Sequence, residues 1–323
     1  MSYAIRATGL VKRFGATTAL AGVDFEVAEG TVLGLLGPNG SGKTTAVRIL
    51  ATLLRADEGR AEVGGYDCVR QAHQVRQLIG LTGQYAAVDD NLTGHENLLM
   101  IGRLVGLSGA DARATAAELL GRFDLAEAAR RPVSTYSGGM RRRLDLALSL
   151  AGRPRVLYLD EPTTGLDPQS RSELWTIVRA LVGEGTTVLL TTQYLEEADR
   201  LADDIVVLDH GAAIARGTPD ALKAGVGGKV LEVRPLDAGR LGAVAALVGA
   251  LASVAPEVHV GPNTVTVPMS DSTLLGEVVR RLERAGIVVT DLALRGPSLD
   301  EVFLSLTGHR AGAEARAEEE IAV

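Results

Sequence analysis

Residues 37–44, GPNGSGKT, constrain the fold of this chain more than any other stretch, because they match the pattern G-x-x-x-x-G-K-[ST] in full. The apolar run VLGLL at residues 32–36 precedes them and predicts a buried strand, and residues 44–54 predict a helix. In a strand–loop–helix unit the glycines let backbone N–H groups point inward at phosphate oxygens, next to the positive end of the helix. A glycine-rich loop without a ligand is the alternative, and this context disfavours it.

We therefore predict a phosphate site in which Lys43 reaches the β- and γ-phosphates and the Thr44 hydroxyl can ligate Mg²⁺. The predicted cofactor-binding residues of the loop are Gly37, Pro38, Asn39, Gly40, Ser41, Gly42, Lys43, Thr44 and Thr45.

A buried strand that ends in two carboxylates, VLYLDE at residues 156–161, is the second constellation. Adjacent side chains at a strand end point in different directions, so they can hold different roles. Asp160 is placed to hold Mg²⁺, and Glu161 is the candidate to polarise an attacking water. An acidic pair after a strand is by itself usually a solvated turn. Together with the phosphate loop it becomes the second half of a nucleotide site.

Short β-rich runs alternate with helical stretches over residues 1–220, which predicts an α/β domain with a largely parallel sheet. Residues 155–159 and 187–190 are further expected core strands. Residues 92–150 are rich in Ala and Leu at helical spacing and predict an inserted helical subdomain.

A second domain is expected from residue 221 to about residue 310, after Gly217-Thr218-Pro219. Its predicted elements have the order β-α-β-β-α-β of the split ferredoxin-like α+β motif, followed by a closing helix. The elements are strand 230–233, helix 238–251, strands near 258 and 265, helix 273–285, strand 287–294 and helix 298–306. Residues 311–323 are small and acidic, and we expect a flexible tail there.

Composition excludes some classes of function. A net charge of −7 and a pI of 5.4 lack the electrostatic footprint of a protein that grips duplex nucleic acid, so no nucleic-acid partner is expected. The single cysteine, Cys68, suits a reducing compartment. No secretory signal is expected at the start of the chain. The uncharged stretch 241–256 is shorter than the roughly 20 residues of a membrane span, so any role at a membrane is expected to require a partner.

Tyr136-Ser137-Gly138-Gly139 stands before an expected helix 140–151 and is a second glycine-rich helix start of the kind that binds phosphate. A second phosphate-binding helix start in a chain with one phosphate loop suggests that the two meet across a dimer. An isolated segment of this kind is more often a helix N-cap with a glycine turn. The three arginines at residues 141–143 are expected to form a solvated face or an interface.

The segment SGGMRRR resembles the ABC signature, and its place after GPNGSGKT and before LYLDEP is the order of ABC ATPase domains. The resemblance covers residues 5–220 and implies an ABC ATPase of the P-loop NTPase class, with ATP and Mg²⁺ as cofactors. It also implies an ATP-dependent homodimer in which two copies sandwich two ATP molecules. Ser137, Gly138 and Gly139 of one copy would then meet the γ-phosphate bound by Lys43 of the other.

The same resemblance assigns roles to three more residues. Phe14 would stack on adenine, although a packed strand residue is an equal alternative. Gln84 would touch Mg²⁺ and begin the segment that faces the membrane subunit, a role that rests on the family alone. Asp167 would belong to the loop that crosses the dimer interface, although LDP by itself reads as a helix start.

Gln193 departs from the family pattern, because ABC domains usually have a histidine at this position. Glutamine can donate to a γ-phosphate and accept from water, but it cannot take up a proton near neutral pH. Proton handling would then fall on Glu161. The predicted catalytic residues are Glu161, Gln193 and Lys43.

Across nearly its whole length the chain resembles the daunorubicin/doxorubicin-resistance ATP-binding proteins of actinobacterial drug exporters, through TYSGGMRRR, DEPTTGLDP, TTQYLEEAD and PSLDEVFLSLTG. This implies a subunit peripheral to the cytoplasmic face of the cell membrane, with a separate multi-span permease of the ABC-2 type, two copies of each. The cargo would be an anthracycline-like drug or a hydrophobic or lipid natural product, which an ATPase sequence cannot decide.

Two other functions fit the sequence less well. A soluble ABC ATPase that acts on DNA or ribosomes would carry tandem domains, coiled-coil insertions or zinc motifs, which this chain lacks. A P-loop kinase or GTPase would leave the SGGM segment unexplained. The closing helix places Leu299, Val302, Phe303 and Leu306 on one face, either to close the second domain or to dock the dimer or permease.

Overall fold

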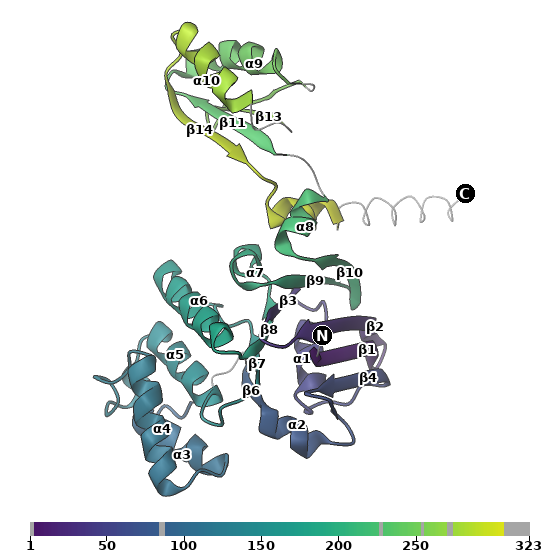
Figure 1. Ribbon diagram of the computed structural model, residues 1–323, viewed down its shortest axis with the longest axis vertical. Coiled ribbons are helices and arrows are strands. Elements are labelled where there is room, and N and C mark those ends of the chain that lie inside the picture. Colours follow the sequence, from purple (N-terminus) through teal and green to yellow (C-terminus); the bar gives the residue numbers. More distant parts are fainter. Residues whose placement is uncertain (1–2, 84–87, 226–228, 253–254, 270–273, 307–323) are drawn as a thin grey trace. The chain divides into compact units, whose positions relative to one another are not determined.

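The computed structural model describes residues 3–83, 88–225, 229–252, 255–269 and 274–306, and the chain divides into two units, residues 1–219 and 220–323 (Figure 1). In the described residues no helix is long and apolar enough to cross a membrane.

A six-stranded sheet forms the centre of the first unit, with the order β10-β9-β3-β8-β7-β6. The five strands from β9 to β6 are parallel, and β10 pairs antiparallel with β9. Every residue of β3, β7 and β8 is buried, which explains why these strands read as apolar runs rather than as alternating patterns. The strands are β3 (Val32–Leu36), β6 (Ile79–Thr82), β7 (Val156–Asp160), β8 (Thr187–Thr192), β9 (Asp204–Asp209) and β10 (Ala212–Gly217). The predicted core strands are therefore confirmed, with β8 running two residues further than expected.

An antiparallel sheet with the order β2-β1-β4-β5 was not foreseen from the sequence. It comprises β1 (Tyr3–Phe14), β2 (Thr17–Ala28), β4 (Glu58–Val63) and β5 (Tyr66–Asp67). Its buried residues share one core with helix α1 (Lys43–Leu50), while helix α2 (Ala72–Leu78) leads into β6. Helix α1 ends four residues before the predicted Leu54, because Thr52 has a φ of 63°, a left-handed conformation that does not continue a helix.

The helical subdomain consists of α3 (Gly94–Leu104), α4 (Gly109–Arg122) and α5 (Gly138–Ser149), drawn in blue at the lower left of Figure 1. All three helices begin after a side-chain N-cap, from Thr93, Ser108 and Ser137 respectively. Their apolar faces join one core with strands β7 and β8 and with α6 (Pro168–Gly183). Helix α7 (Leu195–Leu201) follows β8 and packs against α6.

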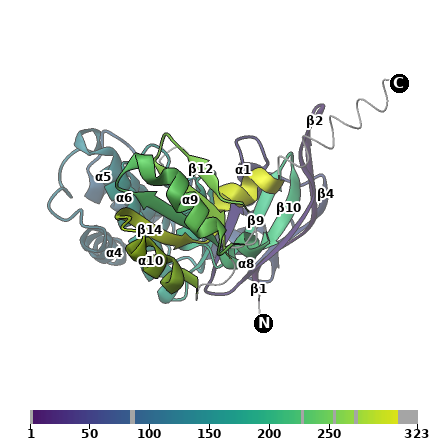
Figure 2. The same cartoon turned by 90° about the horizontal axis from the view of Figure 1, so that it is seen from above.

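The second unit contains a fully antiparallel sheet with the order β12-β13-β11-β14. Its strands are β11 (Val230–Pro235), β12 (Glu257–His259), β13 (Thr264–Pro268) and β14 (Val289–Arg295). Helices α9 (Leu241–Gly249) and α10 (Leu275–Arg284) pack on one face of the sheet, and Figure 2 shows them side by side. The elements follow the predicted β-α-β-β-α-β order, except that helix 238–251 is a 3₁₀ turn, Ala238–Arg240, followed by α9.

In the described residues, one short helix precedes the sheet of the second unit and another follows it. Helix α8 (Pro219–Ala224) precedes the sheet, and residues 299–306 form the closing helix, in which Leu299 and Val302 are buried. The predicted tail at residues 311–323 lies outside the described residues.

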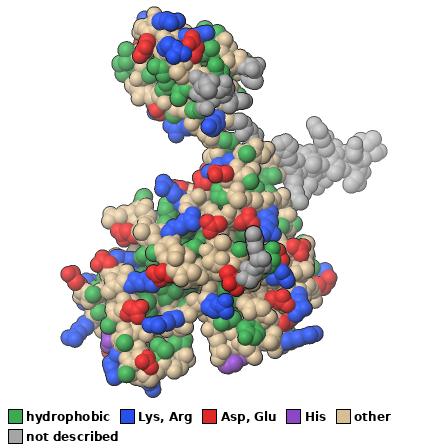
Figure 3. All heavy atoms as spheres, in the orientation of Figure 1, with side chains coloured by type: hydrophobic (Ala, Val, Ile, Leu, Met, Phe, Trp, Pro, Cys, Tyr) green, Lys and Arg blue, Asp and Glu red, His purple; other side chains and the backbone are tan. Residues whose placement is uncertain are grey.

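On the face shown in Figure 3, Lys and Arg side chains alternate with Asp and Glu side chains across the first unit. Charges of both signs are therefore interspersed on this face.

Candidate functional site

The loop between β3 and α1 packs closely against neighbouring backbone. Gly40 has a φ of 83° and Gly42 a φ of 107°, which side-chain-bearing residues rarely adopt. A Cβ on Gly42 would collide with the carbonyl oxygen of Ala19, and one on Gly37 with that of Leu208. Glycine is therefore required at both positions, and the first N–H groups of α1 have no side-chain cap, because Gly42 has no side chain.

Lys43 is almost completely buried at the start of α1. Its Nζ donates to the carbonyl oxygens of Gly37 (2.8 Å) and Pro38 (2.9 Å) and lies 3.6 Å from Glu161 Oε1. Burial lowers the pKa of Lys43. The negative charges of Glu161 and Asp160 act in the opposite direction but only partly offset this effect. The buried Ser41 Oγ has no hydrogen-bond partner among the described residues. A cationic ammonium, free N–H groups and an unsatisfied hydroxyl together fit a phosphate group.

Asp160 closes the other side of this loop from the end of β7. Its Oδ1 accepts hydrogen bonds from Thr44 Oγ1 (3.2 Å) and from Thr191 Oγ1. A carboxylate and a hydroxyl held together in this way are oxygen ligands that Mg²⁺ prefers, and Mg²⁺ typically completes its shell with phosphates and water. In the described part of the chain, no group of three or more His, Cys, Asp or Glu side chains is placed to hold a metal ion. Phosphate and water oxygens would therefore have to complete the shell of an ion bound by Thr44 and Asp160.

Glu161 follows Asp160 in a left-handed conformation with a φ of 50°. The Glu161 N–H donates to both the carbonyl and the hydroxyl oxygen of Thr191 (3.1 Å each), and its Oε2 accepts from Thr164 Oγ1 (3.4 Å). A non-glycine residue held at positive φ costs about 1–3 kcal/mol and persists only where its surroundings fix it.

A cavity of about 370 Å³ connects these groups. Its lining brings Gln193 to the same space as Lys43 and Glu161, although the three are far apart in the sequence. The lining residues are Asn39, Gly40, Gly42, Lys43, Thr44, Thr45, Glu161, Thr164 and Gln193. An acid able to polarise water, a cation and an amide thus face one space, which suits hydrolysis of a bound phosphoanhydride.

The remaining predicted residues lie elsewhere. Phe14 stands at the end of β1 with half of its surface exposed, which argues against the packed-strand alternative, and Lys12 Nζ lies 5.5 Å from its ring centroid. Gln84 lies outside the described residues. Asp167 is the N-cap of α6 and accepts from Ser170 N (2.9 Å), as the reading of LDP as a helix start predicts.

Ser137 is the N-cap of α5, where its Oγ accepts from Met140 N (3.2 Å). Ser137 and Gly138 are exposed, and Gly139 is half-buried beside Ser170. In a single chain the segment is therefore a helix start at the surface, and none of its three residues lines the cavity beside Lys43.

Three residues of this region escaped sequence reasoning. Thr191 and Thr164 contact the acidic pair, and neither carries a recognisable pattern beyond its place after a strand. Arg142 was expected among solvated or interface arginines, yet only 13% of its side chain is exposed. It is buried because it pairs with Asp145 one helical turn away and donates to backbone carbonyls at the strand ends.

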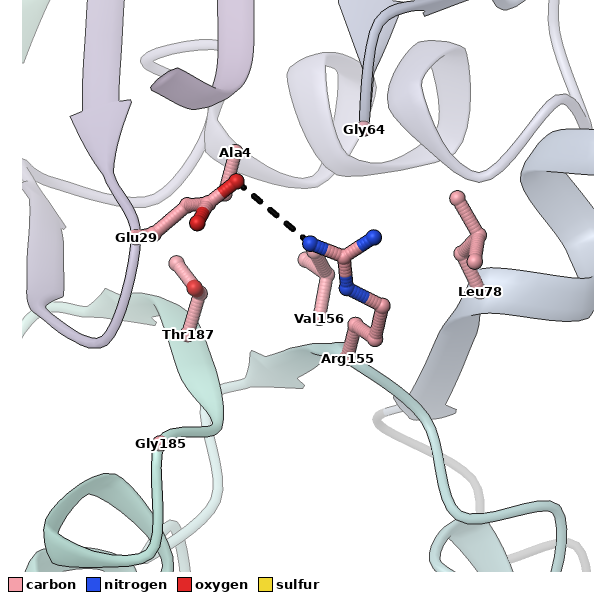
Figure 4. Close-up of a pocket in the computed structure, with 8 residues that line it drawn as sticks. All are labelled: Ala4, Glu29, Gly64, Leu78, Arg155, Val156, Gly185 and Thr187. Atoms are coloured by element: carbon pink, nitrogen blue, oxygen red, sulfur yellow. Dashed lines mark hydrogen bonds and ion pairs between the residues drawn. The ribbon is translucent and has the colours of Figure 1, made fainter. Parts of the chain in front are cut away.

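A second pocket, shown in Figure 4, lies at the opposite ends of the same strands, where Val156 begins β7 and Thr187 begins β8. It holds the ion pair between Arg155 and Glu29, whose nearest atoms are 3.4 Å apart. Its volume of about 60 Å³ admits water but no nucleotide.

Comparisons with known proteins agree with this geometry. The ABC transporter family model matches residues 20–164. The daunorubicin resistance ATP-binding protein DrrA2 of Streptomyces coeruleorubidus is 58% identical, over 95% of this chain and 96% of its own length. The daunorubicin/doxorubicin resistance ATP-binding protein DrrA of Streptomyces peucetius is 50% identical, over 99% of this chain and 98% of its own length. The Nod factor export ATP-binding protein I of Ralstonia nicotianae is 39% identical, over 93% of this chain and 92% of its own length.

Among solved structures, an ATP-binding cassette of an ABC transporter in its ADP conformation matches 68% of this chain and 93% of its own, with a TM-score of 0.62 and 27% identity. The fold and the site together define an ATP-binding cassette, the nucleotide-binding subunit of an ABC transporter. The chain belongs to the family of daunorubicin/doxorubicin resistance ATP-binding proteins. It binds ATP, and its hydrolysis of ATP energises a transporter.

Proposed function

We propose that this chain drives the export of an anthracycline-like drug, or of another hydrophobic or lipid natural product, through a separate multi-span permease of the ABC-2 type. The names of its relatives, which refer to daunorubicin resistance and to Nod factor export, support this cargo class. We further propose two copies of each subunit, with this chain peripheral at the cytoplasmic face of the cell membrane. None of the relatives reported above is named for work on DNA or ribosomes, so nothing favours that alternative.

In the proposed mechanism Lys43, the loop N–H groups and Ser41 hold the phosphates of ATP. Thr44 and Asp160 would hold Mg²⁺, together with Gln84, and the ion would supply neutralisation of phosphate charge. Glu161 accepts a hydrogen bond from the attacking water and thereby polarises it. Gln193 orients the water or donates to a phosphate oxygen, and the half-exposed Phe14 stacks on adenine.

Completion of the site by a second copy is the part of the proposal with the sharpest test. Ser137, Gly138 and Asp167 are exposed in the single chain and are available to meet the phosphates held by a partner. If each site takes its Lys43 from one copy and its Ser137 from the other, two variants that are each inactive can complement one another. A mixture of Lys43→Ala and Ser137→Ala chains contains heterodimers with one intact site.

The experiment measures phosphate release by each variant alone and by the mixture at equal total concentration. We expect the mixture to exceed the sum of the two separate rates. A mixture no more active than that sum would mean that each site is complete within one chain. Efflux of daunorubicin from cells that carry this chain with its permease, compared with cells that carry the permease alone, tests the cargo class.

A further inference from the structure

Arg142 has the least exposed side chain of the three arginines near the start of α5. Its side chain is 13% exposed, against 19% for Arg143 and 36% for Arg141, which pairs with Asp90. A long cationic side chain is seldom buried unless its donors are satisfied, so its contacts identify what holds it in place.

The guanidinium donates to three backbone carbonyls that belong to two strand ends. Nε donates to Pro162 O (2.6 Å), Nη2 to Asp160 O (3.4 Å) and Nη1 to Gly83 O (3.0 Å). Two of these carbonyls flank Glu161, one on each side of it in the chain. The third follows β6, immediately before the segment that contains Gln84.

Buried carboxylates surround the same guanidinium. Nη1 also donates to Asp145 Oδ2 (3.0 Å), and the Asp145 side chain is 2% exposed. Glu197, which is fully buried and accepts from Trp175 Nε1 (3.1 Å), acts on Arg142 through its charge, as does Asp160. Burial lowers the pKa of Arg142, and these three carboxylates raise it in opposition. The charge therefore has a fixed place between α5, β7 and α7.

We propose that Arg142 is a positioning residue for ATP hydrolysis, because it ties helix α5 to the backbone on both sides of Glu161. This inference rests on the proposed role of Glu161 in polarising water. Glu161 has a φ of 50°, so its conformation needs outside restraint, which Arg142 and Thr191 supply. Helix α5 begins directly after Ser137, about 7.5 Å along the helix from Arg142 at 1.5 Å per residue. A partner copy that displaced the Ser137 segment would thus also shift the start of helix α5. The Arg142 side chain would transmit this shift to the backbone beside Glu161.

The test is Arg142→Lys, which keeps the charge but loses the planar fork that reaches several carbonyls at once. We expect kcat for ATP to fall by about 10- to 100-fold, the range that a small misplacement of a reacting group produces. The KM for ATP should stay unchanged, since Arg142 does not line the cavity. Arg153→Gln is the matched control, because Arg153 lies just beyond α5 and makes one exposed ion pair, with Glu118. It should retain the wild-type kcat.

A double-mutant cycle separates positioning from general loss of structure. If Arg142 acts through Glu161, adding Arg142→Lys to Glu161→Gln should not lower the residual rate further. A multiplicative loss would overturn the proposal, as would a wild-type kcat for Arg142→Lys. A wild-type rate for Glu161→Gln alone would instead overturn the proposed role of Glu161, so the two failures are distinguishable.

A second variant keeps the test decisive if Arg142→Lys does not fold. Asp145→Asn is isosteric and weakens the bond that orients Nη1 while it leaves Arg142 in place. We expect a smaller fall in kcat, again with no effect in the Glu161→Gln background. An unchanged kcat for Asp145→Asn in the otherwise wild-type chain would also contradict the proposal.

Discussion

The phosphate-loop region of the first unit and the sheet of the second unit use polar residues in opposite ways. Around the loop, Lys43, Asp160 and Glu161 are at most 9% exposed. Lys43 Nζ lies 3.6 Å from Glu161 Oε1, and the charge of Asp160 also acts on Lys43. In the second unit, charged residues pair on more exposed surfaces, such as Arg295 with Glu232. Buried charges are retained at a cost in desolvation, whereas exposed pairs contribute little to stability. The contrast identifies the loop region of the first unit as the place where buried charges are kept for chemistry.

The largest expected effect concerns the acid of the buried cluster. Glu161→Gln should lower steady-state ATP hydrolysis by about 10²–10⁴-fold, the usual contribution of a general base. ATP binding should be retained or tightened, because the change removes a negative charge 3.6 Å from Lys43 Nζ. Phosphate release and calorimetric ATP binding measure the two quantities. Glu196→Gln, at an exposed position nearby, is the control. Equal hydrolysis rates for Glu161→Gln and wild type would refute the assignment.

A substitution in the hydrophobic core of the second unit should instead lower stability without changing ATP binding. Leu231 is fully buried among residues of that unit, so Leu231→Ala should lower its free energy of unfolding by about 2–5 kcal/mol. Val230→Ala alters the neighbouring, half-buried position of the same strand and should have a smaller effect. Thermal unfolding followed by calorimetry measures the change. We expect the Kd for ATP to stay constant, and a parallel loss of ATP binding would show that the chemistry depends on both units.

The next expected effect concerns Gln193, which lines the cavity together with Lys43 and Glu161. Gln193→Ala should lower kcat by about 10- to 100-fold if its amide bonds a charged oxygen, since such bonds are worth about 1.5–3 kcal/mol. Gln193→His would place a group that titrates near pH 6.5 in the cavity, so kcat should gain a pH dependence that wild type lacks. Rate–pH profiles for the three chains test this. A histidine variant with the wild-type profile would mean that residue 193 takes no part in proton handling.

The smallest expected effect lies on the exposed surface of the second unit. Hydrogen bonds from Arg280 and Arg281 lower the pKa of Glu277. Because the folded pKa lies below the unfolded value, this contribution to stability is present above the unfolded pKa and is lost as pH falls through the folded one. The apparent stability of wild type should therefore decrease slightly more on acidification below about pH 4.3 than that of Glu277→Gln. Unfolding midpoints at pH 7 and pH 3 test this sign, and a steeper decline for the variant would contradict it.

Sequence patterns recovered the elements whose signal is local. The buried strands around VLGLL and VLYLD, the loop between strand and helix, and the β-α-β-β-α-β order of the second unit all follow from short-range periodicity and turn residues. The antiparallel sheet of β1, β2, β4 and β5 was missed. Its strands alternate irregularly because several register shifts interrupt the pairing of β1 with β2.

The sequence by itself determined the class of this protein, because a phosphate loop, an acidic strand end and a glycine-rich helix start are each encoded in a few adjacent residues. The roles of Gln84 and of the dimer contacts at Ser137 and Asp167 stay predictions. Only the tertiary structure decided which distant side chains share a space, such as Gln193 with Glu161, and that the side chain of Arg142 is 13% exposed while that of Arg141 is 36% exposed. The physical reason is that the groups that bury and hydrogen-bond such a side chain lie at strand ends far apart in the sequence. The spacing of residues along the chain does not show which of these strand ends are neighbours in space.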